Sequence, residues 1–310
     1  MNDGAATAGM RLAAPAKINL YLRVLARRDD GYHLIDSVIA FAEEADILTA
    51  TPADEISLEI DGPFAAALTD NSDNLVLRAA RALSDTATVP GGAALNLTKN
   101  LPVAAGIGGG SADAAATLRL LPQLWQLDVD RAILGRIALS LGADVPACLD
   151  GETLRATGAG EKLEKAPTLP AMEIVLVNNG RPVETGAVFS AHGGTFSEPA
   201  PAPLQFDDAA SAARWFGALG NDLLDPACRI EPSIPDVLAA LEAEDGCLLA
   251  QLSGSGATCF AIFETRDTSS AAALRLSEAH PDWWIRASRF RGRPAAIEDA
   301  KPDSSSAPHA

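Results

Sequence analysis

The residues best suited to chemistry form a glycine-rich segment near the middle of the chain. Four glycines fall within five positions, at 106 and 108–110, and Ser111 and Asp113 follow them closely. Glycine lets a backbone approach a ligand and adopt positive φ. A strand-like stretch precedes the segment and a helix-like stretch follows, and the first amides of a helix lack internal acceptors. We therefore predict a phosphate-binding loop of ten residues: Pro102, Val103, Ala104, Ala105, Gly106, Ile107, Gly108, Gly109, Gly110 and Ser111.

This loop differs from two common nucleotide-binding motifs. No Gly-Lys-Ser/Thr follows the glycines, and Ser111 stands where GxGxxG requires its last glycine. A tight structural turn would explain one or two glycines but not easily four. We place Ser111 at the helix N-cap, where it could cap the helix, ligate Mg²⁺, or do both. Asp113 would be repelled by a triphosphate unless it faces away or a cation lies between them, and it could instead simply stabilise the helix dipole.

Lys17 and Asp144 are candidates for the chemistry of phosphoryl transfer. Lys17 begins an apolar strand, and Asp144 lies in a Gly-Ala-Asp-Val-Pro loop. Such a transfer needs a group that accepts the hydroxyl proton and cations that stabilise the moving phosphate. A Lys–Asp pair could serve, because the lysine would keep the carboxylate ionised and oriented. Taken singly, the two residues read as a surface lysine and an ordinary loop aspartate.

Strands and helices must bring these residues together. Period-two and apolar runs predict strands, and i, i+3, i+4 spacing predicts helices. In the first half, strands are expected at 18–24, 56–60 and 95–98, and helices at 74–83, 111–121 and 128–141, the last with Asp128 as N-cap and Gly142 as C-cap. In the second half, strands are expected at 173–177, 248–252, 258–263 and 283–290, and helices at 235–244 and 268–280.

Three regions follow from this pattern. We predict an N-terminal ATP-binding domain over residues 1–166, a C-terminal domain over 167–292, and a disordered Pro/Ser/Ala-rich tail over 293–310. A cleft between two such lobes is a common place for a ligand.

Composition excludes several classes of function. The chain has 310 residues and a net charge of −17, which disfavours binding to nucleic acid or anionic membranes. No run of 18 apolar residues predicts a membrane span, and no signal peptide is expected. The four cysteines form no CxxC pair, so neither a disulfide framework nor a zinc site is expected. These features favour a cytoplasmic protein.

Five segments together resemble the GHMP kinase superfamily. They are residues 15–20 (PAKINL), 30–33 (DGYH), 102–111, 141–146 (LGADVP) and 252–257 (LSGSGA), and they occur in that order. The resemblance runs from about residue 15 to about residue 290. It implies an α+β, two-lobed fold, with an N-terminal lobe like domain 2 of ribosomal protein S5 and a ferredoxin-like C-terminal lobe. The chain would be a monomer or a homodimer.

The resemblance also implies a role for each site residue. Asp144 matches the catalytic base, and Lys17 matches the lysine that supports it. ATP would be bound by the loop together with Asp113, Asn74 and Lys99. A cytidine-diphosphate substrate would be held by Asn19, Tyr32, His33, Thr185, Phe189, Gly254, Ser255 and Gly256. Tyr32 and His33 could instead pack a turn, Phe189 could belong to the core, and residues 254–256, which form a second glycine loop, could be a hairpin turn.

The implied reaction uses ATP and Mg²⁺ to phosphorylate the 2-hydroxyl of a cytidine-diphosphate-linked methylerythritol in non-mevalonate isoprenoid biosynthesis. Homoserine or sugar phosphorylation, an ATP-dependent decarboxylation, and non-catalytic nucleotide binding on the same scaffold are the alternatives. Three positions depart from the family pattern: Asn100 stands where arginine is common, Ala112 where serine is frequent, and Ser255 where threonine is frequent.

Overall fold

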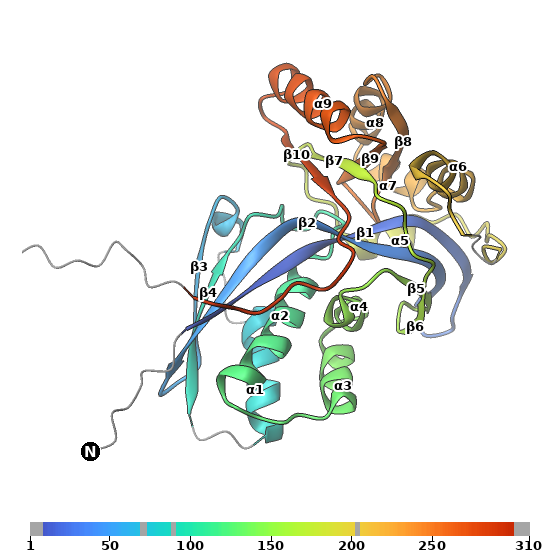
Figure 1. The fold of residues 1–310 in the computed structure, drawn as a ribbon. Helices are drawn as coiled ribbons and strands as arrows, with labels where there is room; N and C mark the ends of the chain where they lie inside the picture. The colour runs from blue at the N-terminus through green and yellow to red at the C-terminus, as the bar shows by residue number, and fades with distance from the viewer. Residues whose placement is uncertain (1–8, 69–72, 88–90, 202–204, 301–310) are drawn as a thin grey trace, which may run out of the picture.

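A computed structural model describes residues 9–68, 73–87, 91–201 and 205–300 (Figure 1). Two long antiparallel strands, β1 (Met10–Arg27) and β2 (His33–Ala53), belong to the N-terminal sheet and also contact the C-terminal lobe. Residues 14–22 of β1 and 36–42 of β2 are buried without interruption, whereas residues 46–50 of β2 alternate between buried and half-buried. Continuous burial means that both faces of the strands are covered where the two lobes meet.

The N-terminal lobe is a seven-stranded sheet in the described residues, with helices packed on one face (Figure 1). Its main strand order is β11-β1-β2-β4-β3, and β5 and β6 extend it beside β2. The further strands are β3 (Ser57–Asp61), β4 (Gly92–Thr98), β5 (Leu154–Gly158), β6 (Lys162–Lys165) and β11 (Glu298–Asp299). The helices are α1 (Leu75–Ala87), α2 (Gly109–Leu124), α3 (Arg131–Leu141) and α4 (Val145–Asp150), and a 3-10 turn spans Ala65–Ala67.

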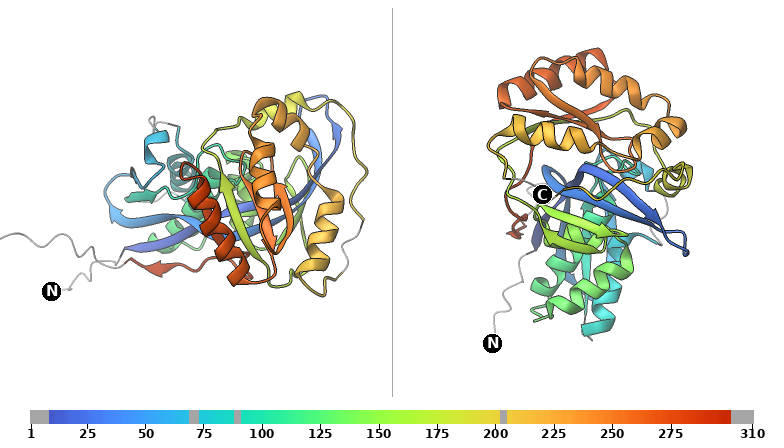
Figure 2. Two further views of the ribbon diagram at one scale, coloured as in Figure 1. Left: turned by 90° about the horizontal axis from the view of Figure 1, so that it is seen from above. Right: turned by 90° about the vertical axis from the view of Figure 1, so that its right-hand side faces the viewer.

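The C-terminal lobe stacks a four-stranded antiparallel sheet against helices (Figure 2). Its strands are β7 (Glu173–Asn178), β8 (Cys247–Leu252), β9 (Cys259–Phe263) and β10 (Trp284–Arg289), in the order β10-β7-β9-β8. The helices are α5 (Thr185–Ala191), α6 (Ala209–Leu219), α7 (Leu224–Ile230), α8 (Ile234–Glu242) and α9 (Arg266–Ala279). Helices join the first strand to the second and the third to the fourth, which is the ferredoxin-like arrangement. The expected α+β, two-lobed fold is therefore confirmed.

One hydrophobic cluster joins the two lobes. Ile18, Leu20 and Tyr21 of β1 pack with Phe216 of α6 and Phe260 of β9, and all are buried. The first predicted strand begins eight residues further upstream, at Met10, and the other six predicted strands match observed strands to within three residues. β2, β5, β6 and β11 were not predicted. In β2, residues 36–42 are buried on both faces and therefore show no period-two pattern. None of the helices in the described part of the chain combines the length and the apolar character that a membrane span requires.

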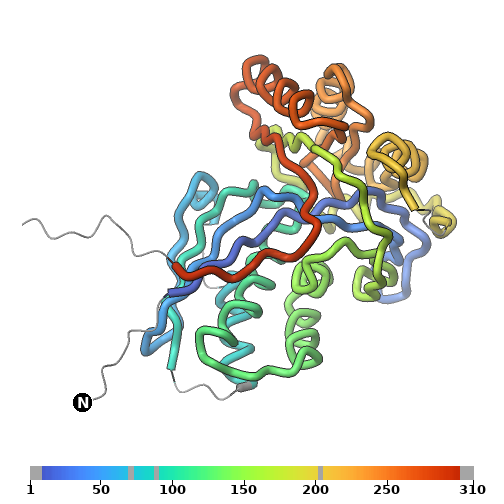
Figure 3. Tube along the Cα trace, viewed as in Figure 1, coloured from blue at the N-terminus to red at the C-terminus, as the bar shows by residue number. Residues whose placement is uncertain are grey.

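The prediction of a disordered tail was wrong for residues 293–300. Figure 3 shows this segment running from β10 back along the N-terminal sheet. Ala295 is buried, and its carbonyl oxygen accepts a hydrogen bond from Arg119 Nη2 of α2 at 2.5 Å. Glu298 and Asp299 then pair with β1 as β11. Composition alone indicated disorder, but a free sheet edge gives this segment backbone partners. Residues 301–310 lie outside the described ranges.

Candidate active site

A cavity of about 940 Å³ lies between the glycine loop, the first strands and the start of α5. Most of the predicted site residues line it: Lys17, Asn19, Tyr32, His33, Asn74, Lys99, Pro102, Val103, Ala104, Ala105, Gly106, Gly108, Gly109, Gly110, Ser111, Asp113, Asp144, Thr185, Phe189, Gly254 and Ser255. Ile107 and Gly256 are not brought to its wall. Ile107 is buried in the hydrophobic cluster between the lobes, and Gly256 packs beneath the second loop against Leu252.

The glycine loop leads directly into α2. The N-cap is Gly108 in the left-handed conformation (φ 62°), and no side chain caps the helix. The prediction of Ser111 as N-cap was therefore wrong, because the preceding glycines carry the helix start three residues further upstream and Ser111 occupies the third helical position. The first amides of α2 lack intrahelical acceptors. With no capping side chain in place, these amides and the Ser111 hydroxyl can meet an anion.

The glycines let three parts of the chain approach closely. A Cβ on Gly106 would lie 2.5 Å from the Ser253 carbonyl oxygen, so the first glycine loop rests on the second. A Cβ on Gly108 would lie 3.2 Å from Lys17 Cβ, and the Lys17 amide donates to the Ile107 carbonyl at 2.9 Å. Small residues here bring the loop against β1 and place its lysine beside the helix start.

Lys17 and Asp144 meet in the cavity. Lys17 Nζ lies 3.0 Å from Asp144 Oδ2 and donates to Asn19 Oδ1 at 3.0 Å. The Lys17 side chain is 6% exposed, whereas Asp144 is 42% exposed. Asp144 occupies the N-cap position of α4 but makes no side-chain cap bond, so its carboxylate is directed to the lysine. A half-exposed carboxylate fixed by a buried ammonium can accept a proton from a bound hydroxyl.

Asn19 connects the pair to the second glycine loop. Its Nδ2 donates to Ser37 Oγ at 2.8 Å, and its backbone amide donates to Ser253 Oγ at 3.2 Å. Asn221, which motif reasoning missed, donates to the carbonyls of Leu252 and Gly254 at 2.9 and 2.8 Å. No local pattern marks Asn221, whereas Ser253 stands beside the predicted loop and could have been found.

The far end of the cavity is aromatic. Tyr32 is 63% exposed at its rim. The rings of His33 and Phe189 stack at 5.2 Å, although the two residues lie in β2 and α5. Burial lowers the pKa of His33, and the charges of Arg27 and His192 add to this effect. His33 is therefore held neutral at physiological pH. Thr185 Oγ1 lies 2.9 Å from Ser255 Oγ on the same side of the cavity.

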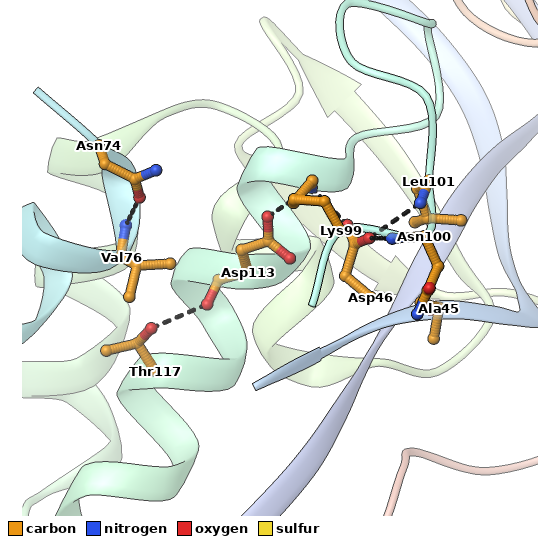
Figure 4. A network of polar contacts seen from close by, with 9 residues as sticks. All are labelled: Ala45, Asp46, Asn74, Val76, Lys99, Asn100, Leu101, Asp113 and Thr117. Carbon is orange, nitrogen blue, oxygen red and sulfur yellow. Dashed lines mark hydrogen bonds and ion pairs between the residues drawn. The ribbon is translucent and has the colours of Figure 1, made fainter. Parts of the chain in front are cut away.

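Lys99 and Asp113 form a buried ionic cluster with Asp46 (Figure 4). Lys99 Nζ lies 2.7 Å from Asp113 Oδ2 and also contacts Asp46 Oδ2. Burial raises the pKa of Asp113 to about 7, although Lys99 opposes the shift. Burial would lower the pKa of Lys99, but the two carboxylates outweigh it and raise that pKa. The cation beside Asp113 is thus Lys99, whose charge is already balanced by carboxylates.

Asn74 precedes α1, and its Oδ1 accepts the Val76 amide at 2.8 Å (Figure 4). This bond orders the start of the helix. Asn74 also lines the cavity.

Comparison with known proteins identifies the family. Residues 74–152 match the family described as GHMP kinases N terminal domain, and residues 205–282 match GHMP kinases C terminal. The chain is 51% identical over 274 residues to the 4-diphosphocytidyl-2-C-methyl-D-erythritol kinase of Paramagnetospirillum magneticum, covering 88% of this chain and 96% of that protein. It is 49% identical over 286 residues to the kinase of the same name from Parvibaculum lavamentivorans, covering 90% and 98%.

Solved structures agree with these relatives. A crystal structure of 4-(cytidine 5'-diphospho)-2C-methyl-D-erythritol kinase aligns with a TM-score of 0.76 and 34% identity over 91% of this chain and 100% of that one. A homoserine kinase from Cytophaga hutchinsonii aligns with a TM-score of 0.66 at 17% identity over 96% and 99%, which shows the fold alone. The chain belongs to the 4-diphosphocytidyl-2-C-methyl-D-erythritol kinases, a branch of the GHMP kinase family.

Proposed function

We propose that this enzyme transfers the γ-phosphoryl group of ATP to the 2-hydroxyl of 4-diphosphocytidyl-2-C-methyl-D-erythritol, giving the 2-phosphate and ADP in non-mevalonate isoprenoid biosynthesis. One observation carries the proposal. The Lys17–Asp144 pair, at 3.0 Å, lies in a single cavity with the glycine loop and with the aromatic group of Tyr32, His33 and Phe189. Such an arrangement would supply a phosphate-binding loop, a proton acceptor and a base-binding end within one site.

The nucleotide phosphates would bind at the start of α2. No side chain caps the amides of Gly109 and Gly110, and the Ser111 hydroxyl makes no cap bond. The helix dipole adds partial positive charge at the same place. Lys99 contributes little net charge, because Asp46 and Asp113 neutralise it. The phosphates are therefore held mainly by backbone amides and by the cation that accompanies ATP.

Mg²⁺ fits the donors present, because the Ser111 hydroxyl and the phosphates supply the oxygen ligands that this ion prefers. Ser111 would hold it together with ATP. When bound, the ion neutralises charge on the transferring phosphoryl group.

Asp144 acts as the proton acceptor in this proposal. Lys17 holds the carboxylate in place, and Asn19 holds Lys17 from the other side. As the substrate oxygen attacks the γ-phosphorus, the bond from that phosphorus to the ADP oxygen breaks and ADP leaves. The hydroxyl proton passes to Asp144, and the Lys17 ammonium stabilises the negative charge that develops nearby.

The cytidine would occupy the aromatic end. The exposed Tyr32 ring offers a face on which a pyrimidine can stack, and Phe189 offers a second face within the same cavity. A neutral His33 can both donate and accept a hydrogen bond at the pyrimidine edge.

The four cysteines are unpaired, which supports a reducing cytoplasmic compartment.

An ADP-release assay tests the substrate. The purified enzyme with Mg·ATP receives the cytidyl substrate, homoserine, galactose or mevalonate in separate reactions. We expect turnover with the cytidyl substrate, the 2-phosphate as its product, and none above background with the other three. No turnover with the cytidyl substrate, or faster turnover with another alcohol, would reject the proposal. Release of carbon dioxide from mevalonate-type substrates would indicate a decarboxylase instead.

A further inference from the structure

Asp46 joins β2 to the strand that leads into the glycine loop. Its side chain is fully buried. Oδ1 accepts hydrogen bonds from the backbone amides of Asn100 at 2.6 Å and Leu101 at 2.9 Å, and Oδ2 accepts one from Lys99 (Figure 4). Asn100 also donates from its side chain to the Ala45 carbonyl at 3.2 Å. One carboxylate thus fixes the residues that immediately precede Pro102.

The same cluster holds the other end of the loop. Lys99 bridges Asp46 to Asp113, which lies in the second turn of α2. A Cβ on Gly109 would lie 3.5 Å from both Asp46 Oδ2 and Lys99 Nζ. The cluster therefore lies against the first residue of α2, where the phosphate-binding amides begin.

Burial makes this connection rigid. Asp46, Lys99 and Asp113 are at most 3% exposed. If one charge were removed from such a cluster, its partner would remain unpaired in a low-dielectric environment, which is strongly unfavourable. Asp46 itself is not among the residues that line the cavity, so a bound nucleotide would not touch it.

We propose that Asp46 is a positioning residue for the nucleotide phosphates, because it ties residues 99–101 and, through Lys99, the start of α2 into one fixed arrangement around the glycine loop. The inference rests on the proposed function only in naming ATP as the phosphate ligand. It assigns Lys99 to the support of the loop and gives Asp46 a role that no sequence motif indicates.

Two variants separate the two kinds of interaction that Asp46 makes. Asp46→Asn keeps an oxygen that can accept from the Asn100 and Leu101 amides but removes the charge paired with Lys99. Asp46→Ala removes both the hydrogen bonds and the ion pair. Asp36→Asn is a matched control, because Asp36 lies in the same strand, is fully buried, and pairs with Arg155 and Tyr21 away from the loop.

Hydrogen exchange and ADP binding supply the readouts. We expect both Asp46 variants to accelerate amide exchange in residues 103–112 and to weaken ADP binding about tenfold by calorimetry, with Asp46→Ala the larger effect. The KM for ATP should rise in parallel, while the KM for the cytidyl substrate stays within about twofold. Asp36→Asn should lower the melting temperature without changing exchange in the loop or ADP affinity. If Asp46→Ala does not fold, Asp46→Asn carries the test.

If folded Asp46→Asn shows the wild-type rate of amide exchange in residues 103–112 and the wild-type affinity for ADP, the inference is overturned. Equal changes in Asp36→Asn would also overturn it, because they would indicate a general loss of stability. Neither readout requires phosphoryl transfer. A wild-type enzyme that binds ADP but does not phosphorylate the cytidyl substrate would therefore reject the proposed function and leave the role of Asp46 intact.

Discussion

Asp144→Asn is the sharpest test of the proposed chemistry. The substitution keeps the size of the side chain and an oxygen that can accept from Lys17, now 3.0 Å away. It removes the carboxylate that would take the hydroxyl proton. Because Asp144 is 42% exposed and makes no cap bond in α4, we expect little change in the free energy of unfolding.

The expected loss lies in kcat. A positioned general base contributes about 10²–10⁴-fold, which corresponds to about 3–5 kcal/mol of transition-state stabilisation. Removing the Lys17 ammonium should also lower kcat, because Asp144 loses the group that orients it. At 3.0 Å and an effective dielectric constant of about 20, the pair attracts by about 5.5 kcal/mol, and water around the half-exposed Asp144 reduces this to a fraction. We expect Lys17→Met to lower kcat about 10²-fold through the orientation of Asp144.

Single-turnover rates with saturating Mg·ATP measure the chemical step, and calorimetry with ADP checks that nucleotide binding is retained. The double variant Asp144→Asn/Lys17→Met completes a cycle. The effects of residues that act as a unit are non-additive. The double variant should therefore lose no more activity than the less active of the two single variants. Asp144→Asn with more than about a tenth of wild-type kcat, or fully additive losses, would refute the paired mechanism.

Three further outcomes follow from local geometry. Gly106→Ala places a Cβ 2.5 Å from the Ser253 carbonyl at φ +73°, so urea unfolding should show a loss of at least about 2 kcal/mol; unchanged stability would contradict the close packing of the loops. Tyr32→Ala should raise the KM for the cytidyl substrate about tenfold and leave that for ATP unchanged in initial-rate assays; equal increases would argue against stacking. Burial raises the pKa of Asp36, but hydrogen bonds from Arg155 and Tyr21 outweigh it and hold the pKa below its ordinary value. The stability contributed by Asp36 is therefore present above the unfolded-state pKa of about 4 and lost as pH falls. The difference in unfolding free energy between wild type and Asp36→Asn should shrink from about pH 6 to about pH 3, and a constant difference would disprove this.

The sequence by itself determined the features that short windows contain. Clustered glycines before a helix-like run predicted the phosphate loop, because positive φ and free helix amides are local properties. Alternating or apolar runs predicted most strands. Motif order also selected Lys17 and Asp144 and indicated the family.

Only the tertiary structure decided how these pieces meet. It paired Lys17 with Asp144, stacked His33 on Phe189, and enclosed Lys99 between Asp46 and Asp113. It also moved the helix start upstream of Ser111 and gave residues 293–300 a place on the sheet. Such contacts join residues far apart in the chain. They depend on the packing of two long strands between two lobes, which no local pattern encodes.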